Sequence, residues 1–550
     1  MTYKPNDEQR TVITSQAPVV VVLGGAGTGK TVTAVAAARE HLQQSDEKLT
    51  VLRAAAAREG RRARLPARER ALFLSFSRTA VTQIIDRAGD VIGNLGPRLE
   101  VSTFDGFAWR IICSFGPHHG YPAPQTVQSK ANSLVEGAPA GLTYDELIPA
   151  ANRLMALPKV RDHYSSRYGI VICDEFQDTD PQEWNFLQQI APSARRILLG
   201  DVNQCIYTFK PGVDAAARID EAMALPGATE IRLLPTSYRD PSGMLPAAAE
   251  AARLRDFSDP AIQAAAATGR LSVIPFEDEA GHDQVVAITR RARHRGDTVS
   301  VFTHTNSATT DLSDALTTAG LAHEQVGFTE AYGEALSAQL AMVQFALRQD
   351  AQVLRSLAVY VTATQSRTRV PPLAQQMLAP QNNPLLLRAL QRLSDDLRAT
   401  GGDQPDLDRL ATVIAQAYSR IGTHRGQETW VQAARQTRNT LRRASENFRM
   451  GAISDELLRM RDETLVGSQI VRRFPIQVMN LHQTKGREAD TTILLLGPDE
   501  FYGYEDEPYP NGSKLLYVVM SRARKHAHIV VPRRTHPLWE PLVTALQQPV

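Results

Sequence analysis

The chain has 550 residues, a length that predicts three or four domains rather than one. Hydrophobic residues make up 43% and charged residues 22% of the sequence, which is typical of a packed protein and excludes global disorder. The 61 basic and 59 acidic residues give a net charge of +2, so the overall charge indicates no particular partner.

Secreted, membrane-spanning and disulfide-rich classes are not expected. The first residues lack a basic stretch followed by an apolar core, and the longest apolar runs, such as Val19–Leu23, have only the length of a strand. Cys113, Cys173 and Cys205 are spaced for neither a disulfide framework nor a zinc site. We therefore interpret them as isolated reduced thiols, in or near the core of a cytoplasmic protein.

Apolar strands alternate with helical segments in the first and last parts of the chain. The first strand, Ala17–Leu23, ends in glycines and leads into a helix predicted over Thr31–Leu42. The same set continues with short strands over Leu72–Phe76, Leu99–Ser102, Ile170–Cys173 and Ile197–Leu199. A second set is predicted over Leu271–Pro275, Thr298–Thr303, Ile476–Met479, Thr492–Leu496 and His528–Val531. This rhythm is typical of parallel sheets, whose functional loops follow the carboxyl ends of the strands.

The middle of the chain has a different character. Between Gly333 and Val471 no strand is predicted, and the sequence is rich in Ala, Leu, Gln and Arg at helical spacing. Prolines and glycines divide this stretch into several helices.

Seven arginines and two glutamates lie between Arg53 and Arg70, after the first helix. Such a run fits an arm that contacts a phosphate backbone. It fits equally a solvated helix or loop, and this interpretation is favoured because blocks of like charge usually face solvent.

The strongest chemical signal is a complete G-x-x-x-x-G-K-[ST] motif between a strand and a helix. It comprises Gly24, Gly25, Ala26, Gly27, Thr28, Gly29, Lys30 and Thr31. Glycines let backbone N–H groups converge on phosphates, the lysine neutralises the β- and γ-phosphates, and the threonine hydroxyl reaches Mg²⁺. The sequence therefore predicts a site for ATP with Mg²⁺.

Two adjacent carboxylates, Asp174 and Glu175, end the strand Ile170–Cys173. We expect Asp174 to hold Mg²⁺, directly or through water, and Glu175 to orient and deprotonate the attacking water. An Asp-Glu pair is common, so this pair alone is weak evidence.

The longer segment Asp174-Glu175-Phe176-Gln177-Asp178 resembles motif II of the UvrD/Rep-type superfamily 1 DNA helicases. Further segments resemble the other motifs of that family in the correct order along nearly the whole chain. They are Asn6–Gln9, Ser75–Ala80, Ser102–Phe107, Gly200–Phe209, Tyr238–Arg239, His482–Glu488 and Leu516–Ala523. Together these segments identify the superfamily, although each alone is weak.

The resemblance implies roles for further residues. Gln9 would read adenine, Tyr238 would stack on it, and Glu488 would accept from the ribose. Gln204 would sense the γ-phosphate, while Arg239 and Arg522 would stabilise the charge that hydrolysis builds there. DNA would be contacted by Phe76, Thr103, Phe104, Tyr207, Phe209 and His482. Structural alternatives stay open: a capping box for Gln9, core packing for Tyr207 and Phe209, and surface ion pairs for the two arginines.

Several residues depart from the family's motifs. Val202 and Asn203 replace two acids in motif III, and Asp105 stands where the family usually has histidine. None of the departures removes a group that hydrolysis needs. Most lie in segments that would touch DNA or couple the two activities.

The predicted fold class is α/β, with two RecA-like parallel-sheet P-loop motor domains and helical insertions. The first motor domain would comprise residues 1–111 and 166–234 around a short insertion at 112–165. The second would comprise 235–332 and 472–550 around a helical accessory insertion at 333–471. Only 26 residues follow Arg524 in this sequence, so an appended nuclease domain is not expected there.

The functional hypothesis is an ATP-dependent DNA helicase that moves on single-stranded DNA, with 3′→5′ polarity implied only by the resemblance. Single-stranded and tailed duplex DNA would be its partners, with a nuclease or repair factor as a possible protein partner and no membrane. The alternative is a DNA-stimulated ATPase subunit that regulates such a partner and unwinds little. A nucleotide-binding protein with no nucleic-acid role is the third and weakest interpretation.

Overall fold

The computed structural model describes residues 3–58, 68–76, 78–121, 127–137, 141–207, 210–277, 281–325, 329–365, 368–401, 405–422, 425–447, 474–484, 487–497, 505–533 and 536–547. The chain divides into two units. The first comprises Met1–Tyr121, Ile148–Thr305 and Ile470–Val550, and the second comprises Pro122–Leu147 and Asn306–Gln469.

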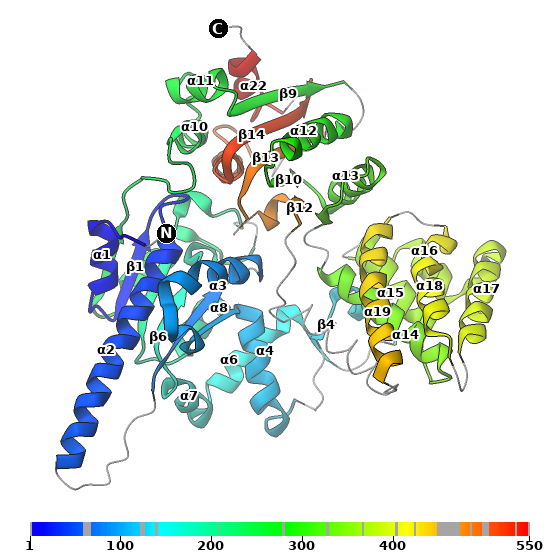
Figure 1. The fold of residues 1–550 in the computed structure, drawn as a ribbon, viewed down its shortest axis with the longest axis horizontal. Coiled ribbons are helices and arrows are strands. Elements are labelled where there is room, and N and C mark those ends of the chain that lie inside the picture. Colours follow the sequence, from blue (N-terminus) through cyan, green and yellow to red (C-terminus); the bar gives the residue numbers. More distant parts are fainter. Residues whose placement is uncertain are drawn as a thin grey trace. The chain divides into compact units, whose positions relative to one another are not determined.

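A parallel six-stranded sheet forms the first half of the first unit (Figure 1). Its strand order is β3-β2-β6-β7-β1-β8. The central strand β1 is buried at every position because its β-branched residues are covered on both faces. The strands are β1 (Val19–Leu23), β2 (Arg70–Ser75), β3 (Leu99–Thr103), β6 (Tyr168–Cys173), β7 (Arg195–Gly200) and β8 (Ala228–Arg232).

The helices of this half include one that is much longer than predicted. Helix α2 runs over Lys30–Arg58, so Arg53 and Arg58 lie on a helix, while residues 59–67 lie outside the described part of the chain. Helix-favouring residues continue to Arg58, and neither glycine nor proline interrupts them. The other helices are α1 (Asp7–Thr14), α3 (Arg78–Ile92), α4 (Phe104–Phe115), α6 (Tyr144–Met155), α7 (Pro158–Ser165), α8 (Pro181–Gln189) and α9 (Ala215–Met223).

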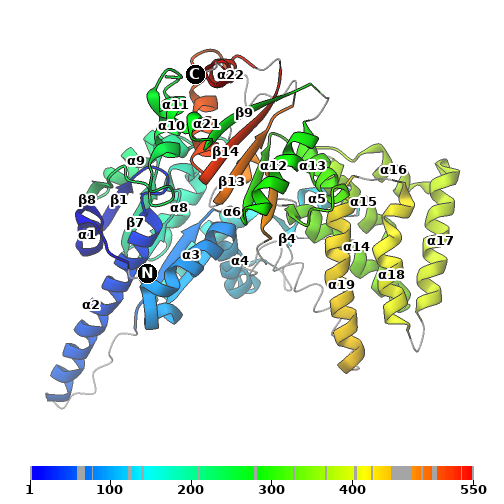
Figure 2. The same cartoon turned by 45° about the horizontal axis from the view of Figure 1, so that its top comes forward.

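A second parallel sheet forms the other half of the first unit, and its strand order there is β12-β10-β13-β14-β9. The strands are β9 (Leu271–Phe276), β10 (Val299–Thr303), β12 (Ile476–Asn480), β13 (Ala489–Leu495) and β14 (Ala523–Pro532). The helices are α10 (Met244–Arg253), α11 (Pro260–Ala267), α12 (His282–His294), α21 (Pro510–Met520) and α22 (Glu540–Gln547) (Figure 2). The two parallel sheets confirm the predicted α/β fold class with two RecA-like halves.

The second unit is mainly helical, as predicted for the stretch after Gly333. An aromatic cluster lies in its core: the ring of Tyr418 stacks on Trp430 at 5.4 Å, and Tyr360 meets Tyr418 edge-on at 4.8 Å. Its helices are α5 (Lys130–Leu134), α13 (Asn306–Thr318), α14 (Thr329–Ala346), α15 (Val353–Gln365), α16 (Pro372–Leu378), α17 (Pro384–Thr400), α18 (Leu407–Ala417) and α19 (Gln427–Asn447). Its short strands are β4 (Val127–Gln128), β5 (Leu142–Thr143) and β11 (Glu324–Gln325).

Further details differ from the sequence analysis. Strand β8 was not predicted, because among its residues Ala228–Arg232 only Ile231 is buried. Cys113 is exposed rather than in or near the core, whereas Cys173 and Cys205 are buried, and these three residues form no disulfide. None of the described helices is long and apolar enough to cross a membrane.

Candidate active site

The phosphate-binding loop follows β1 and leads directly into α2. Gly27 and Gly29 have φ angles of 78° and 86°, in the left-handed region that disfavours side chains. A Cβ atom at Gly29 would also lie 2.9 Å from Nε2 of Gln9. The glycines at both positions are therefore required by backbone conformation, as the motif predicts.

Lys30 and Thr31 begin α2, and their side chains make different contacts. The Lys30 ammonium donates to the carbonyl oxygens of Gly24 at 2.5 Å and Gly25 at 3.0 Å. The Thr31 hydroxyl lies 3.5 Å from Oδ2 of Asp174, although 143 residues separate the two in the chain. A hydroxyl beside a carboxylate offers the hard oxygen ligands that suit Mg²⁺.

Glu175 follows β6 with a φ of 52°, a left-handed conformation that is uncommon for a side-chain-bearing residue. Its Oε2 accepts a hydrogen bond of 2.7 Å from Nε2 of Gln177. Oε1 of Gln177 accepts from the backbone N–H of Asp201 at 3.1 Å. Gln177 therefore orients Glu175 and ties it to the end of β7, a role that the sequence analysis did not assign.

Gln204 and Arg522 meet although they come from loops of different sheets. Nη2 of Arg522 donates to Oε1 of Gln204, and Nε2 of Gln204 donates to Oδ2 of Asp201 at 2.6 Å. Arg522 is only 2% exposed. Burial, followed by the charge of Arg239, lowers the pKa of Arg522, while the carboxylates Glu175 and Glu488 act in the opposite direction.

Arg239 forms an ion pair with Glu488, with Nη2 2.6 Å from Oε1, and each side chain is 9% exposed. Nη1 of Arg239 also donates to the carbonyl oxygen of Ser521. The second oxygen of Glu488 accepts from Arg524 at 3.2 Å. Glu488 therefore lies between two arginines, and Arg239 is not the surface ion pair that the sequence left open.

Tyr517 on α21 contributes a link that the sequence analysis missed. Its hydroxyl accepts from the backbone N–H of Ala26 in the phosphate-binding loop at 3.1 Å and lies 3.4 Å from Oδ2 of Asp201. Burial and the negative charge of Asp201 raise the pKa of Tyr517, so its hydroxyl stays protonated. Tyr517 thus connects the second sheet's half of the unit to the phosphate-binding loop.

Gln9 satisfies both interpretations of its motif. It forms the capping box of α1 with Asn6, and its Nε2 also donates to the carbonyl oxygen of Thr28 at 3.2 Å. Tyr238 donates its backbone N–H to the carbonyl oxygen of Gly27 at 2.8 Å, and its side chain is largely exposed. These contacts place Gln9 behind the loop and the Tyr238 ring beside it.

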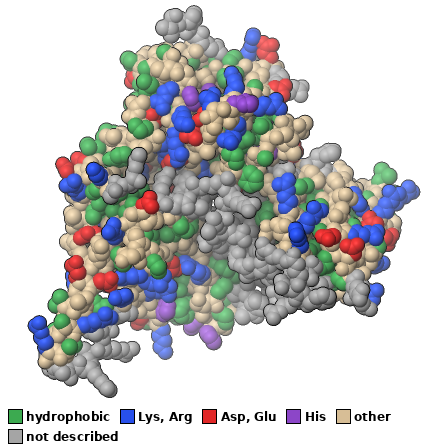
Figure 3. Space-filling view, viewed as in Figure 1, with side chains coloured by type: hydrophobic (Ala, Val, Ile, Leu, Met, Phe, Trp, Pro, Cys, Tyr) green, Lys and Arg blue, Asp and Glu red, His purple; other side chains and the backbone are tan. Residues whose placement is uncertain are grey.

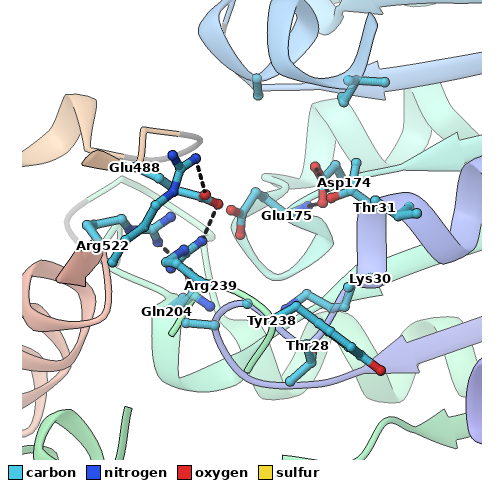
Figure 4. A pocket seen from close by; sticks show the side chains of 17 residues that line it. Thr28, Lys30, Thr31, Asp174, Glu175, Gln204, Tyr238, Arg239, Glu488 and Arg522 are labelled. Carbon is cyan, nitrogen blue, oxygen red and sulfur yellow. Dashed lines mark hydrogen bonds and ion pairs between the residues drawn. The ribbon is translucent and has the colours of Figure 1, made fainter. Parts of the chain in front are cut away.

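These residues surround one cavity of about 480 Å³, within the usual size of a small-molecule site. Figure 4 shows Lys30, Thr31 and Asp174 on one side, with Arg239, Arg522 and Glu488 facing them. The full lining is Ala26, Gly27, Thr28, Gly29, Lys30, Thr31, Val32, Ala80, Ile84, Asp174, Glu175, Gln204, Tyr238, Arg239, Glu488, Arg522 and Arg524. The structure thus brings together residues from segments more than 490 residues apart.

The residues expected to contact DNA are placed less uniformly. Phe104 is 2% exposed, and its ring packs 5.1 Å from that of Phe76, which is half-buried. The Thr103 hydroxyl caps α4 by accepting from the N–H of Gly106 at 3.0 Å. Tyr207 is half-buried outside any strand, with the ammonium of Lys210 5.1 Å from its ring. Phe209 and the side chain of His482 lie outside the described residues.

Comparison with known proteins agrees with this arrangement. A family model described as an AAA domain matches residues 8–210. DNA helicase II of Escherichia coli (strain K12) is 31% identical over 144 residues, which cover 24% of this chain and 19% of that protein. The YjcD protein of Bacillus subtilis (strain 168), assigned as an ATP-dependent DNA helicase, is 21% identical over 424 residues, covering 71% of this chain and 55% of that protein.

The chain is a distant homologue of the UvrD/Rep-type DNA helicases. The chain is also similar, over a shorter segment, to the RecBCD enzyme subunit RecB of Mycobacterium tuberculosis (strain ATCC 25618 / H37Rv). It is 43% identical over 70 residues, which cover 12% of this chain and 6% of RecB. The homologue spans about half the length of YjcD and less of the other two proteins.

Proposed function

We propose that this UvrD/Rep homologue is a cytoplasmic ATP-dependent DNA helicase that moves along single-stranded DNA and separates duplex strands in repair, recombination or defence. One observation carries the proposal: groups from both sheets of the first unit line a single nucleotide-sized cavity. A cavity shared in this way couples nucleotide chemistry to movement of its walls.

The residues have distinct roles in the proposed hydrolysis. The N–H groups of the glycine loop and Lys30 bind the phosphates, and Gln9 and Tyr238 position the adenine. Thr31 and Asp174 would hold Mg²⁺, which neutralises charge on the β- and γ-phosphates. Glu175, oriented by Gln177, accepts a proton from the attacking water.

The opposite wall would stabilise the transition state. Arg522 and Arg239 carry guanidinium groups that suit the charge developing on the γ-phosphate. Gln204 bonds to Arg522 and to Asp201, so a change at the phosphate is transmitted to the end of β7. We infer that closing and opening of this wall drives stepping, with Glu488 released from Arg239 as the ribose enters.

DNA would run over the carboxyl ends of the first sheet's strands. Phe76 directly follows β2, Thr103 ends β3, and Tyr207 lies in the segment after β7. We propose that Phe104, Phe209 and His482 contribute there. The burial of Phe104 means that its contribution needs a rearrangement of the Phe76–Phe104 pair. The polarity proposed is 3′→5′, as the resemblance implies.

ATP turnover measured alone and with single-stranded DNA, duplex DNA or RNA tests this proposal. We expect single-stranded DNA to stimulate turnover most, and Glu175→Gln to bind Mg-ATP while turning over at least about 100-fold more slowly. An absence of hydrolysis, or hydrolysis indifferent to nucleic acid, would overturn it.

A second candidate is a DNA-stimulated ATPase subunit that regulates a partner nuclease or repair factor and unwinds little. The match to RecB, named as a subunit of an enzyme complex, favours this candidate. Strand displacement from a 3′-tailed duplex by the isolated chain distinguishes the two, because only a helicase displaces the strand without a partner.

A further inference from the structure

Three arginines converge on one glutamate at the beginning of the first sheet's strands. Oε1 of Glu100 lies 2.6 Å from Nη1 of Arg110, and Oε2 lies 3.0 Å from Nη2 of Arg167. Nε of Arg70 lies 3.8 Å from the same Oε2. The Tyr168 hydroxyl also donates to Oε2 at 2.7 Å. Arg70, Arg110 and Arg167 are called the arginine triad below.

One carboxylate does not neutralise the arginine triad. Each guanidinium carries five N–H donors, so the triad has about fifteen donors against about four lone-pair positions on Glu100. The triad side chains are 36–47% exposed, whereas that of Glu100 is 12% exposed. The excess positive charge therefore lies at a partly exposed surface, although Nη2 of Arg70 donates to the carbonyl oxygen of Pro97 at 3.0 Å and the Nε atoms of Arg70 and Arg167 are buried.

The positive charge continues onto α2. Arg68 and Arg98 share one acid, Asp46 of α2, at 3.8 Å and 2.7 Å. Beyond Asp46 the end of α2 is exposed and carries Arg53 and Arg58. Basic side chains gather over the lower part of α2 and the elements beside it in Figure 3.

The triad is built to keep its guanidinium groups in place. Arg110 lies over the ring of Phe107 at 5.2 Å, and Arg167 lies over the ring of Tyr168 at 5.6 Å. Burial alone would raise the pKa of Glu100, but the Tyr168 hydrogen bond and the charges of Arg110 and Arg167 lower it. Glu100 therefore stays ionised and holds the triad together at neutral pH.

This surface is separate from the nucleotide cavity and from the proposed DNA path. Glu100 is the second residue of β3, and Tyr168 is the first residue of β6. Asp174 and Thr103 lie at the opposite, carboxyl ends of these strands. Glu100 lies three positions before Thr103 along β3, a distance of about 10 Å.

We propose that the arginine triad is a second contact site for the phosphodiester backbone of nucleic acid, continued by the arginines of α2. Guanidinium forks bind phosphate oxygens in a bidentate manner, and several half-exposed arginines around one acid suit a polyanion. The choice of nucleic acid as the ligand rests on the proposed function, whereas the arrangement of the arginines does not. It would hold a second stretch of DNA while the motor acts on the first.

Oligonucleotide affinity across a salt series tests the site. The variant Arg70→Gln/Arg110→Gln/Arg167→Gln should bind about tenfold more weakly at low salt, with a slope shallower by about 0.7 per lost contact for single strands and 0.9 for duplex. Whichever DNA form shows the larger change is the ligand of the triad. The matched control Arg10→Gln/Arg232→Gln/Arg533→Gln removes the same charge from other positions of the first unit and should change the slope less.

A variant of opposite sign separates binding from structural support. Glu100→Gln removes the neutralising charge, so DNA binding should tighten and the salt slope should steepen if the triad contacts phosphates. If thermal unfolding shows that either variant is not folded, Arg110→Gln alone provides the test, because Arg110 is 47% exposed. In that variant the salt slope should become shallower by the amount given above for one lost phosphate contact.

Three results would overturn the site. The first is a salt slope of the triad variant equal to that of the control variant, and the second is no tightening of DNA binding in a folded Glu100→Gln variant. The third is a triad variant that loses binding to poly-glutamate but not to DNA, which would assign the surface to an acidic protein. DNA-stimulated ATP turnover at saturating DNA should be unchanged in the triad variant. Failure of the proposed function is seen differently, as an absence of DNA stimulation in the unaltered chain.

Discussion

Arg239 and Glu488 form an ion pair, with Nη2 2.6 Å from Oε1, between a loop that follows the first sheet and a loop that precedes β13 of the second. The pair is nearly buried and lines the nucleotide cavity. A charged group in such a place is strongly destabilising when its partner is removed, so this contact links the stability of the first unit to its chemistry.

Arg239→Ala should therefore lower both stability and activity. We expect a loss of about 1–3 kcal/mol in the free energy of unfolding, since Glu488 loses one of its two arginines, and a fall of at least about 100-fold in ATP turnover. Adding Glu488→Ala should restore part of the stability but none of the turnover. Denaturant unfolding and steady-state hydrolysis measure the two effects, and near-normal turnover in Arg239→Ala would remove this residue from the catalytic set.

Gln9 can be tested by a variant that keeps its capping contact. Gln9→Glu keeps an oxygen that accepts from the N–H of Asn6 in the capping box but removes the Nε2 donor that bonds to Thr28. Because Gln9 is only 1% exposed, the carboxylate facing the Thr28 carbonyl should lower the melting temperature, and the preference for ATP over GTP should fall. Gln9→Ala, which removes both contacts, is the matched comparison. An unchanged preference in both variants would show that Gln9 does not read the base.

Tyr517→Phe removes one hydroxyl between the phosphate-binding loop and Asp201. The N–H of Ala26 then loses its acceptor, so we expect about 1 kcal/mol of destabilisation and an approximately tenfold lower turnover at similar ATP affinity. Tyr164→Phe, a change at a buried tyrosine of the same unit outside the cavity, provides the control. Equal kinetics for the two variants would make Tyr517 a packing residue only.

His528 predicts a loss of stability in mild acid. Burial, followed by the charges of His526, Arg295 and Arg291, lowers the pKa of His528 from 6.5 to about 4. The unfolded chain therefore takes up the proton first, so stability is complete above pH 6.5 and falls as the pH drops towards 4, by at most about 1.4 kcal/mol per pH unit. His528→Gln should flatten this dependence in urea unfolding, whereas the exposed His294→Gln should not. A dependence unchanged by His528→Gln would assign the acid sensitivity to other groups.

Local chemistry explains why much of the site could be predicted from the sequence. The phosphate-binding loop needs glycine at Gly27 and Gly29 for its backbone conformation, and Asp174 and Glu175 end a strand that is apolar throughout. Each of these signals is contained within a few consecutive residues. The two parallel sheets follow from the same alternation of apolar strands and helices.

Pairings between distant segments could not be predicted in this way. Arg239 and Glu488 are 249 residues apart, and Tyr517 is 491 residues from Ala26. An arginine or a tyrosine has many possible partners, and its own neighbours in the sequence do not indicate which it meets. The helix predicted over Thr31–Leu42 continues to Arg58 because helix propensity runs on without a break, and the sequence analysis had left a solvated helix and a loop both open for the arginines that follow.

The burial of Phe104 had a signal in the sequence. Phe104, Phe107, Ala108, Ile111 and Ile112 repeat at the spacing of one helix face, and all five are buried. The motif resemblance indicated a DNA contact at Phe104, whereas the helical pattern indicated the core. In this structure Phe104 lies in the core, as the helical pattern indicates, and its contact with DNA remains a prediction.

ATP-driven movement along single-stranded DNA is the central claim, and its most direct test is the arrival time at a labelled 5′ end. Oligonucleotides of increasing length are bound by the chain, and ATP is added together with a trap for free protein. We predict a lag in the fluorescence signal that grows linearly with length and is absent with Glu175→Gln or with a 3′ label. A lag independent of length, in a chain that hydrolyses ATP on the same DNA, would contradict translocation.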